Sequence, residues 1–326
     1  MKIAITGATG FLGSNLTKSL QLAGHTIHAL VRDEQKMIGL IEPDYFVVGD
    51  INDHEALTKL FTGVDAVIHT VSNFRVVKGA DESYYKTNQA GTKSALKIAR
   101  DCGVKRFVHT STIGVHGDVK HTPAKENSPL NPGDLYQSTK LLAEEACHKY
   151  AEEGAMEIII VRPTSQYGPG DFRMLKMFRM IKNQRFLLIG PCREYFHAVY
   201  IDDLVRGYQR ILDTKDLNGQ IFFIGGERYL SLREYIHTAA RALGVKKPYI
   251  QIPYWPMYFA GWLCEVVCKP FGIEPPLHRR RIKFFKNNRA FNISKAKHVL
   301  GYVAQVELDE GMRRTVDWYR SEGLLD

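Results

Sequence analysis

The sequence is poor in cysteine and lacks a secretory leader. Its five cysteines show no paired spacing, which favours reduced thiols over a disulfide framework. Cys264 and Cys268 lie one helical turn apart in an apolar run, and we interpret them as small buried hydrophobes rather than ligands. No basic and apolar leader precedes the strand-like segment KIAIT at residues 2–6. These absences predict a cytoplasmic protein.

Patterns for binding metals and nucleic acids are also missing. No cluster of His, Cys and Asp has metal-ligand spacing, and there is neither a zinc-finger pattern nor an RNP-like aromatic motif. We therefore expect no metal and no nucleic-acid partner. The net charge of +9 instead indicates phosphorylated ligands or an anionic membrane surface. The densest basic run, HRRRIKFFKNNR at residues 278–289, is either a solvated face or such an anion-binding patch.

A hydrophobic run long enough to cross a membrane is absent. The most apolar stretch, residues 252–274, is interrupted by prolines and charges: Pro253, Pro256, Glu265, Lys269 and Pro270. A spanning helix needs about twenty predominantly apolar residues, so we exclude one here. Our first interpretation is a helix that lines an apolar substrate pocket. The second is peripheral membrane contact through residues 252–289, with the basic residues 279–281 beside it.

The first half of the chain does contain a regular alternation of short apolar segments and amphipathic segments. Strands are predicted at residues 2–6, 26–31, 45–50, 65–70, 106–112 and 157–163. Helices are predicted at residues 11–23, 53–61, 81–103 and 135–153. Such alternation predicts an α/β fold of the Rossmann type, with a doubly wound parallel sheet covered on both faces.

After Pro163 the alternation loosens. Further helices are predicted near residues 172–182 and 202–213, and strands at 185–190 and 220–225, with no Ser/Gly linker and no internal repeat. We expect a dinucleotide-binding domain at residues 1–165, to which residues 196–225 return. Residues 166–195 and 226–326 would form a smaller, mostly helical substrate-binding region.

A glycine-rich turn follows the first predicted strand. In ITGATGFLG, the residues Gly7, Gly10 and Gly13 have GxxGxxG spacing and open the first predicted helix. Glycines allow backbone N–H groups to approach a pyrophosphate, and the helix N-terminus adds partial positive charge. The position between strand and helix makes this turn a strong dinucleotide-binding signal.

The end of the second predicted strand bears on which dinucleotide binds. Sites for NAD usually carry an acidic residue there, for the ribose 2′-hydroxyl. Here Val31 and Arg32 occupy the tip, with Asp33 just beyond. A cation suits a 2′-phosphate, so NADP(H) is favoured, and NAD(H) remains possible if Asp33 takes the acidic role.

A tyrosine and a lysine stand four residues apart in LYQSTK. In a helix Tyr136 and Lys140 share one face, where the lysine could stabilise a tyrosinate or form an ordinary exposed pair. Three motifs in order, GATGFLG, TSTIGVHG and YQSTK, resemble the extended short-chain dehydrogenase/reductase family, which is the NAD(P)-dependent epimerase/dehydratase superfamily. VGDI, YKTNQAGT, RPTSQYGPGD and VYIDDL extend the resemblance over nearly the whole chain.

The resemblance implies a catalytic set. Tyr136 matches the catalytic tyrosine and Lys140 its partner, which would also hold the nicotinamide ribose. A free tyrosine has a pKa of about 10, and nearby positive charge favours the phenolate that accepts a substrate proton. Thr112 matches the third position, usually serine, and Ser111 is the alternative if the register slips by one.

The same resemblance implies cofactor contacts along the ends of the strands. His69 and His116 would be packed or hydrogen-bonded residues rather than bases, and Asn88 would be structural. The predicted cofactor-binding residues are Gly7, Thr9, Gly10, Phe11, Leu12, Gly13, Arg32, Asp50, Ile51, His69, Thr70, Val71, Ser111, Tyr136, Lys140, Pro163 and Thr164.

Two substitutions argue against a nucleotide-sugar substrate. Ser165 and Phe196 stand where sugar-nucleotide enzymes of the family often carry asparagine and arginine, and a diphosphate needs charged partners. Aromatic residues could instead build an apolar pocket: Tyr195, Phe196, Tyr254, Trp255, Tyr258, Phe259 and Trp262. Those features resemble the hydroxysteroid dehydrogenase and dihydroflavonol reductase branches.

We therefore expect an NADP(H)-preferring oxidoreductase that interconverts a secondary alcohol and a ketone on a hydrophobic, steroid-, lipid- or flavonoid-like substrate. The alternatives are a nucleotide-sugar epimerase or dehydratase with transient hydride transfer, and a dinucleotide-sensing binding protein without catalysis. The resemblance also implies a homodimer formed through the helices at residues 81–103 and 134–153.

Overall fold

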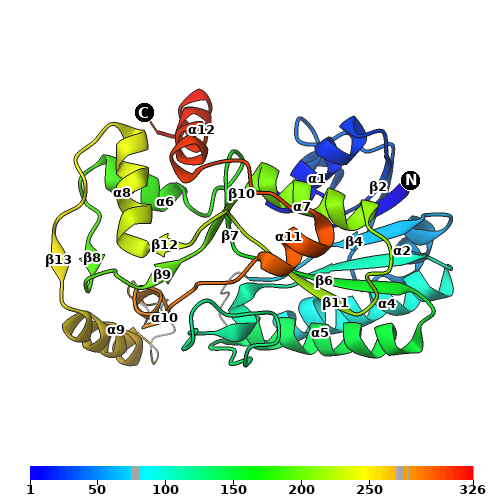
Figure 1. The fold of residues 1–326 in the computed structure, drawn as a ribbon, viewed down its shortest axis with the longest axis horizontal. Coiled ribbons are helices and arrows are strands. Elements are labelled where there is room, and N and C mark those ends of the chain that lie inside the picture. The colour runs from blue at the N-terminus through cyan, green and yellow to red at the C-terminus, as the bar shows by residue number, and fades with distance from the viewer. Residues whose placement is uncertain (75–80, 269, 271–274, 276, 278, 326) are drawn as a thin grey trace.

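A seven-stranded sheet organises the chain (Figure 1). The computed structural model describes residues 1–74, 81–268, 270, 275, 277 and 279–325. Neighbouring strands of the sheet all pair in parallel, in the order β11-β6-β5-β4-β1-β2-β3. The strands are β1 (Lys2–Thr6), β2 (Thr26–Val31), β3 (Tyr45–Val48), β4 (Ala66–His69), β5 (Arg106–Thr110), β6 (Glu157–Pro163) and β11 (Gln220–Ile224).

Helices cover both faces of this sheet, which confirms the predicted Rossmann-type architecture. Side chains alternate between the faces, so Ile3 and Ile5 enter one apolar cluster while Ala4 enters the other. The first cluster includes residues of α1 (Phe11–Leu22) and α7 (Ile201–Asp213). The second includes residues of α2 (His54–Phe61), α4 (Gly91–Asp101) and α5 (Leu135–Glu153). Figure 1 shows α1 and α7 above the strands and α4 and α5 below them.

The predicted helix at residues 81–103 is more complex than its sequence pattern indicates. It consists of α3 (Asp81–Tyr84), the π-helical turn η2 (Tyr85–Ala90) and α4. The buried Asn88 lies in the π-helical turn, where its side chain bonds the backbone N–H and carbonyl of Asn73 at 2.7 and 3.0 Å. It also donates to Thr139 Oγ1 of α5 at 3.0 Å. The wider turn thus places an amide where three segments meet.

The C-terminal region is mostly helical, with three short pairs of strands. The strand predicted at residues 185–190 shortens to β8 (Leu188–Ile189), and the helix predicted near 172–182 begins at Leu175. The helices of the C-terminal region are α6 (Leu175–Lys182), α8 (Leu232–Leu243), α9 (Tyr254–Cys268), α10 (Arg279–Lys283), α11 (Ser294–Leu300) and α12 (Leu308–Ser321). The pairs are β7 (Ser165–Tyr167) with β10 (Ala198–Tyr200), β8 (Leu188–Ile189) with β13 (Gln251–Ile252), and β9 (Tyr195–Phe196) with β12 (Leu230–Ser231).

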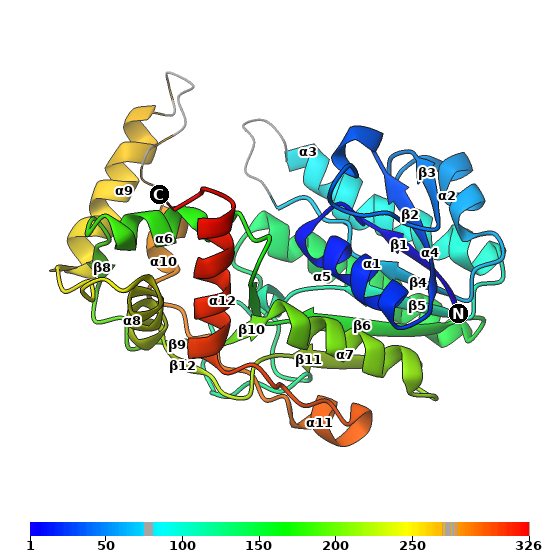
Figure 2. The ribbon, with the colours of Figure 1, turned by 90° about the horizontal axis from the view of Figure 1, so that it is seen from above.

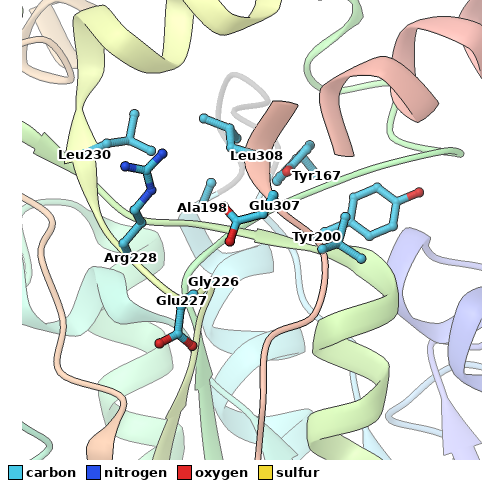
Figure 3. A pocket seen from close by; sticks show the side chains of 10 residues that line it. Tyr167, Ala198, Tyr200, Gly226, Glu227, Arg228, Leu230, Glu307 and Leu308 are labelled. Carbon is cyan, nitrogen blue, oxygen red and sulfur yellow. The ribbon is translucent and has the colours of Figure 1, made fainter. Parts of the chain in front are cut away.

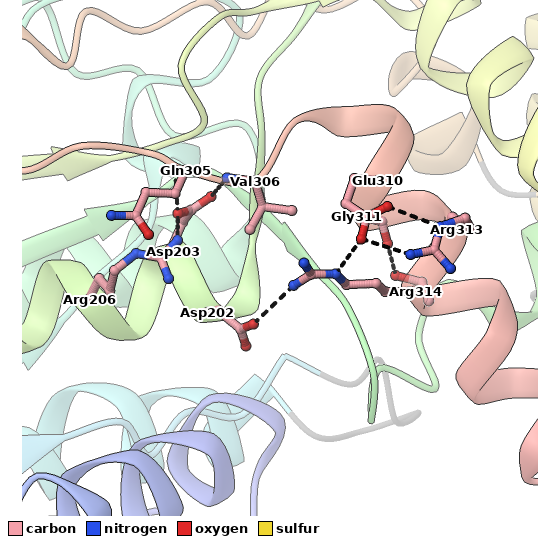
Figure 4. Close-up of polar contacts among 10 residues, drawn as sticks. Asp202, Asp203, Arg206, Gln305, Val306, Glu310, Gly311, Arg313 and Arg314 are labelled. Atoms are coloured by element: carbon pink, nitrogen blue, oxygen red, sulfur yellow. Dashed lines mark hydrogen bonds and ion pairs between the residues drawn. The ribbon is translucent and has the colours of Figure 1, made fainter.

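A buried carboxylate fastens the C-terminal segment to the sheet domain (Figure 4). Asp203, in α7, accepts the backbone N–H groups of Gln305 at 2.7 Å and Val306 at 3.1 Å, and it pairs with Arg206. Nearby, Arg314 of α12 lies 3.8 Å from Asp202. The VYIDDL motif therefore connects α7 to the chain that leads into α12.

Candidate functional site

The predicted site residues collect at one edge of the sheet. They follow the carboxyl ends of β1 to β6, and in parallel sheets all these ends lie at the same edge. The strand order changes direction between β1 and β4, because β1 lies between β2 and β4. Ligands of open α/β sheets bind in the crevice at such a switch point.

The glycine turn between β1 and α1 is packed too tightly for side chains. Gly7 has a φ of +79°, and a Cβ there would lie 2.7 Å from Thr70 Oγ1. A Cβ on Gly13 would lie 2.1 Å from the carbonyl oxygen of Gly7. α1 begins after Gly10, with no capping side chain and no acidic residue in its first turn. Its first N–H groups are therefore available to an anion such as a pyrophosphate.

The tip of β2 exposes a cation. β2 ends at Val31, so the exposed Arg32 is the first residue beyond the strand. Asp33 Oδ1 accepts the backbone N–H of Gln35 at 3.0 Å and caps a short 3-10 helix. At the end of β3, the Asp50 carboxylate binds the backbone and side chain of Asn52 at 3.1 and 2.9 Å. Arg32 is thus the side chain at this tip that is free of a local capping role.

Tyr136 lies in the first turn of α5, which Asp134 caps by accepting the N–H of Gln137 at 2.9 Å. Removal of its hydroxyl from water raises the pKa of Tyr136. The hydrogen-bonding side chain of Ser72, the charge of Arg173 and the hydroxyl of Thr112 act in the opposite direction. Thr112 and Ser72 therefore lie near the phenol, whereas Arg173 acts on it through its charge. The catalytic roles of Thr112 and Tyr136 stay predictions.

Lys140 lies one turn further along α5 and is buried. Its Nζ donates to the carbonyl oxygen of Thr110 at 2.6 Å and lies 3.2 Å from His109 Nε2. Burial lowers the pKa of Lys140 to about 8. Burial also holds the pKa of His109 well below its usual range, so the neutral imidazole accepts from the ammonium. The β5 strand thus fixes the lysine.

Two buried hydroxyls at the strand ends have no protein partner. Ser111 Oγ and Thr164 Oγ1 lack a hydrogen bond to any residue that the structure describes. Buried polar atoms are nearly always satisfied, so these two atoms are suited to a bound ligand. Thr112 differs, because its Oγ1 accepts the N–H of Gly114 at 3.0 Å. Together with the glycine turn, the unpartnered hydroxyls fit a dinucleotide laid along this edge.

His69 and its neighbours at the end of β4 are largely occupied by internal contacts. Its ring nitrogens lie 2.8 Å from Thr6 Oγ1 and 3.1 Å from Thr92 Oγ1, and burial lowers the pKa of His69 to about 3. Thr70 Oγ1 donates to the carbonyl oxygen of Thr6 at 2.7 Å. The side chain of His69 is therefore a neutral packing group, and its contact with the cofactor stays a prediction.

Comparison with known proteins identifies the family. A sequence profile described as the NAD dependent epimerase/dehydratase family matches residues 3–225. The chain belongs to this family. The resemblance inferred from the motifs is thereby confirmed, and this family member is an NAD(P)-dependent enzyme of the extended short-chain dehydrogenase/reductase type.

Relatives of this epimerase/dehydratase-family enzyme include a nucleotide-sugar epimerase and a sterol dehydrogenase. It is 30% identical over 327 residues to UDP-glucose 4-epimerase of Vibrio cholerae, covering 96% of this chain and 94% of that one. It is 28% identical to the decarboxylating sterol-4-alpha-carboxylate 3-dehydrogenase of Candida albicans, with 98% of both chains covered. A solved UDP-glucuronic acid 4-epimerase of Bacillus cereus, in complex with NAD, superposes with a TM-score of 0.79 at 24% identity over 99% of each chain. That likeness shows the fold.

A buried ion pair behind the site escaped the sequence analysis of this family member. Arg162 of β6 donates through Nε and Nη2 to Glu144 of α5, at 2.9 and 2.5 Å, and both side chains are almost wholly buried. Arg162 Nη1 also lies 2.9 Å from His116 Nε2, and burial lowers the pKa of His116 to about 4. The one available signal was the spacing of Tyr136, Lys140 and Glu144, which places all three on one face of α5.

The aromatic residues expected around the substrate differ in their exposure to solvent. Phe196 is buried, with its ring 4.5 Å from that of Tyr235 and 5.8 Å from that of Phe284. Trp255 and Phe259 are exposed on α9, which packs through its other side against α10. That this helix lines a substrate pocket stays a prediction.

A small pocket in the C-terminal region lies apart from the predicted site (Figure 3). It has a volume of about 20 Å³ and is lined by residues that include Tyr167, Tyr200, Leu230 and Leu308. None of the predicted site residues lines it. Such a volume holds about one water molecule, so the pocket is too small for a substrate. No group of three or more His, Cys, Asp or Glu among the described residues is placed to hold a metal ion.

Proposed function

We propose that this protein is an NADP(H)-preferring oxidoreductase that interconverts a secondary alcohol and a ketone on a hydrophobic substrate. The observation that carries the proposal is the placement of Tyr136, one helical turn before the buried Lys140 of α5 and near Thr112 and Ser72, at the carboxyl edge of the sheet. This edge also holds the glycine turn and the unpartnered hydroxyls of Ser111 and Thr164.

The proposed chemistry assigns a proton to Tyr136. The nicotinamide, when bound, supplies the hydride that reaches the carbonyl carbon in reduction or accepts it in oxidation. Tyr136 gives its phenolic proton to the carbonyl oxygen as the O–H bond forms, or takes the proton back in oxidation. Thr112 would hold the reacting oxygen by a hydrogen bond, and Lys140 would orient the cofactor ribose. Because burial raises the pKa of Tyr136, the proton-donating form prevails at neutral pH.

Arg32 supports the preference for NADP(H). It stands exposed immediately after β2, where a guanidinium can bind a 2′-phosphate with charge-assisted hydrogen bonds. Asp33, the residue that could favour NAD(H), already caps a 3-10 helix through Gln35. The solved relative binds NAD, so the preference is a property proposed for this chain alone.

Two positions support a hydrophobic substrate. Phe196 is buried among aromatic rings, and Ser165 presents a short side chain in β7. Neither provides the charge that a sugar diphosphate requires. Relatives that include a sterol dehydrogenase agree with a steroid- or lipid-like ligand.

A nucleotide-sugar epimerase is the second candidate, because the relative that is 30% identical is a UDP-glucose 4-epimerase. Both reactions would use Tyr136, but an epimerase returns the hydride and leaves the cofactor unchanged overall. A dinucleotide-sensing protein without catalysis is the third.

One assay separates these candidates. Purified protein is mixed with NADP⁺ or NAD⁺ and hydroxysteroids, long-chain hydroxy compounds, flavonoid-type alcohols or UDP-sugars, and cofactor absorbance and products are followed. Net cofactor reduction with an apolar alcohol is expected. Conversion of a UDP-sugar without net reduction would establish the epimerase instead, and inactivity with every compound would favour the binding protein.

We also propose a homodimer formed through α4 and α5. The two helices are already joined within the chain, since Arg100 pairs with Glu153 at 3.0 Å and stacks on Tyr150 at 5.2 Å. The amphipathic pattern of α4 and the mixed apolar and charged residues of α5 are compatible with a four-helix bundle formed with a second copy. Light scattering on the purified protein measures the oligomeric state directly, and a monomer at assay concentrations would contradict the proposed homodimer.

A further inference from the structure

Helix α9 carries an uncovered apolar stripe. Among the described residues of α9, Gly261 alone is buried. A Cβ on Gly261 would lie 2.7 Å from Ile282 of α10. Trp255 and Phe259 are 67% and 60% exposed. Six exposed apolar residues follow the helical spacing of a single face. They are Trp255, Phe259, Trp262, Leu263, Val266 and Val267, and we call them the α9 stripe.

The α9 stripe lies on a projecting part of the molecule. Figures 1 and 2 show α9 at the end remote from the seven-stranded sheet, with α10 beside it. Contiguous exposed apolar surface of this kind marks an interaction site in soluble proteins. Residues 269, 271–274, 276 and 278, which belong to the apolar and basic stretch singled out in the sequence, lie outside the described residues, and the argument rests on α9 and α10 alone.

Positive charge flanks the stripe. Lys286 Nζ lies 4.8 Å from the ring centre of Trp255 and 5.0 Å from that of Tyr254. Lys283 at the end of α10 is exposed as well. Glu265, the one acidic residue in α9, is paired with Arg279 at 2.6 Å. The flank therefore presents ammonium groups beside tryptophan, the combination that suits an anionic lipid surface.

The dimensions of α9 decide how it can meet a bilayer. A helix of 15 residues is about 22 Å long, shorter than the roughly 30 Å hydrocarbon core. No described helix is long and apolar enough to cross a membrane. Because one side of α9 packs on α10, only the α9 stripe is left to meet a bilayer, with cations at its edge. Such a helix is suited to lie in the interface, with the stripe in the boundary between headgroups and acyl chains.

A second copy of the chain is a poorer occupant of the stripe. In a two-fold dimer the same patch meets itself, so the lysines beside one stripe would approach the lysines beside the other. Like charges placed together oppose such an interface. An anionic bilayer removes this repulsion and uses the same charges for attraction.

We propose that the α9 stripe is a peripheral membrane anchor that inserts Trp255, Phe259 and Trp262 into the surface of an anionic phospholipid bilayer, with Lys286 contacting the headgroups. The inference concerns a surface apart from Tyr136. It goes beyond the proposed oxidoreductase activity and does not depend on the identity of the substrate.

Vesicle co-sedimentation of the full chain tests the anchor. Phosphatidylcholine vesicles with and without phosphatidylserine are compared for the wild type and for the triple variant Trp255→Ser, Phe259→Ser, Trp262→Ser. The wild type should sediment with the phosphatidylserine vesicles, and the triple variant should partition at least about tenfold less. Tyr249→Ser, which removes an exposed aromatic outside α9, is the matched control and should behave as the wild type.

A separate variant tests how much the positive charge of Lys286 contributes to membrane binding. Lys286→Glu should lower binding to phosphatidylserine vesicles by about fivefold or more and leave binding to phosphatidylcholine unchanged. Equal partitioning of the wild type and the triple variant, or no binding by the wild type, would overturn the anchor. So would a wild-type dimer that the triple variant converts to a monomer, because the stripe would then be a subunit interface.

Tryptophan fluorescence tests the lipid contact with conservative Trp→Phe substitutions, which should leave the fold intact. The chain has three tryptophans, and Trp318 lies in α12, away from the stripe. Brominated lipids should quench the wild type strongly, and the variant Trp255→Phe, Trp262→Phe weakly although it still binds. Equal quenching of both would place the lipid contact elsewhere and refute the α9 anchor.

Discussion

Tyr136 and Lys140 lie one turn apart on α5, yet their surroundings differ. The Tyr136 hydroxyl lies near Ser72 and Thr112, whereas Lys140 Nζ is buried against the carbonyl oxygen of Thr110. Burial moves their pKa values toward each other, because it raises that of the phenol and lowers that of the ammonium. The lysine is thus held by β5, through Thr110 and His109.

Removal of the phenolic hydroxyl tests the proposed acid and base. Tyr136→Phe should lower kcat by at least about a hundredfold, since a positioned proton donor contributes roughly 10² to 10⁴ in rate. Binding of the cofactor, measured by fluorescence titration, should change little. Tyr150→Phe on the same helix is the control and should retain full activity. Turnover close to that of the wild type in Tyr136→Phe would rule out the assigned role.

Arg32 is tested by comparing the two cofactors. Arg32→Ala should weaken NADPH binding by about 10- to 100-fold, because it removes a charge-assisted contact with the 2′-phosphate. NADH binding should change by less than about twofold. Lys36→Ala serves as the control for nearby positive charge, since Lys36 lies 3.9 Å from Asp33. Equal losses for both cofactors in Arg32→Ala would contradict the preference for NADP(H).

Lys140 makes the stability of the ligand-free protein depend on pH. Its pKa is about 8 in the folded chain and near 10.5 when exposed, so between these values the unfolded chain binds more protons. The free energy of unfolding should therefore rise with pH across this window through Lys140, by about 3 kcal/mol at most. Lys140→Met should remove this rise in chemical denaturation at about pH 8 to 10. Parallel pH profiles for variant and wild type would show that the lysine is not desolvated.

Residue types with local motifs were predictable, and residues that act through space were not. The glycine turn, Thr112, Tyr136 and Lys140 carry recognisable spacing, and the structure places Thr112 beside Tyr136. Ser72, His109 and Arg173 lie in segments without a distinctive pattern, and their role depends on which strands become neighbours. The cofactor contacts of the remaining predicted residues stay predictions.

At the scale of elements, contacts before and after Tyr136 hold helix α5 in place. Asp134 caps its N-terminus, and Glu144 is tied to Arg162 of β6 two turns after Tyr136. Asn88 of the π-helical turn bonds Thr139 from the side. The position of the phenol thus depends on contacts with two other elements, in addition to the helix itself.

The buried ion pair should be essential for this arrangement. Glu144→Ala leaves the Arg162 charge unpaired in the interior, and it should lower the free energy of unfolding by about 3 to 5 kcal/mol. Glu55→Ala breaks an exposed pair with Lys59 in α2 and should have little effect. Urea unfolding of both variants provides the comparison. A similar small loss in each would mean that Arg162 is solvated or paired elsewhere.

The elements themselves were largely visible in the sequence. All seven sheet strands were predicted, and β6 agrees with its predicted bounds, because buried parallel strands are continuous apolar runs. The π-helical turn at residues 85–90 was not predictable, since its cause is the bonding of Asn88 to distant segments. The strand predicted at 185–190 shortened because only Leu188 and Ile189 pair with β13.

At the scale of the whole molecule, the chain leaves the seven-stranded sheet after β6 and returns to it later. β11 completes the sheet after the excursion through β7 to β10, and the C-terminal segment returns to contact α7. Tyr302 also donates to the carbonyl oxygen of Gly225 at 2.7 Å. The C-terminal segment is therefore held by polar contacts as well as by apolar packing.

Substitution of Asp203 tests the attachment of the C-terminal segment to α7. Asp203→Asn cannot satisfy the N–H groups of Gln305 and Val306 together with Arg206, and it should cost about 1 to 3 kcal/mol of stability. Asp202→Asn, next to it in the chain, changes a half-exposed carboxylate 3.8 Å from Arg314 and should cost less. Protease digestion should cut Asp203→Asn faster near residues 301–307. Identical digestion patterns for both variants would count against the proposed tie.

The late position of β11 has a consequence for synthesis on the ribosome. β6 pairs with β5 on one edge and needs residues 220–224 on the other, and residues 164–219 must emerge in between. At about 5 to 20 residues per second, several seconds pass during which a nascent chain presents an open, strongly apolar strand edge. Such edges template aggregation, so this interval is when the growing polypeptide depends most on chaperones.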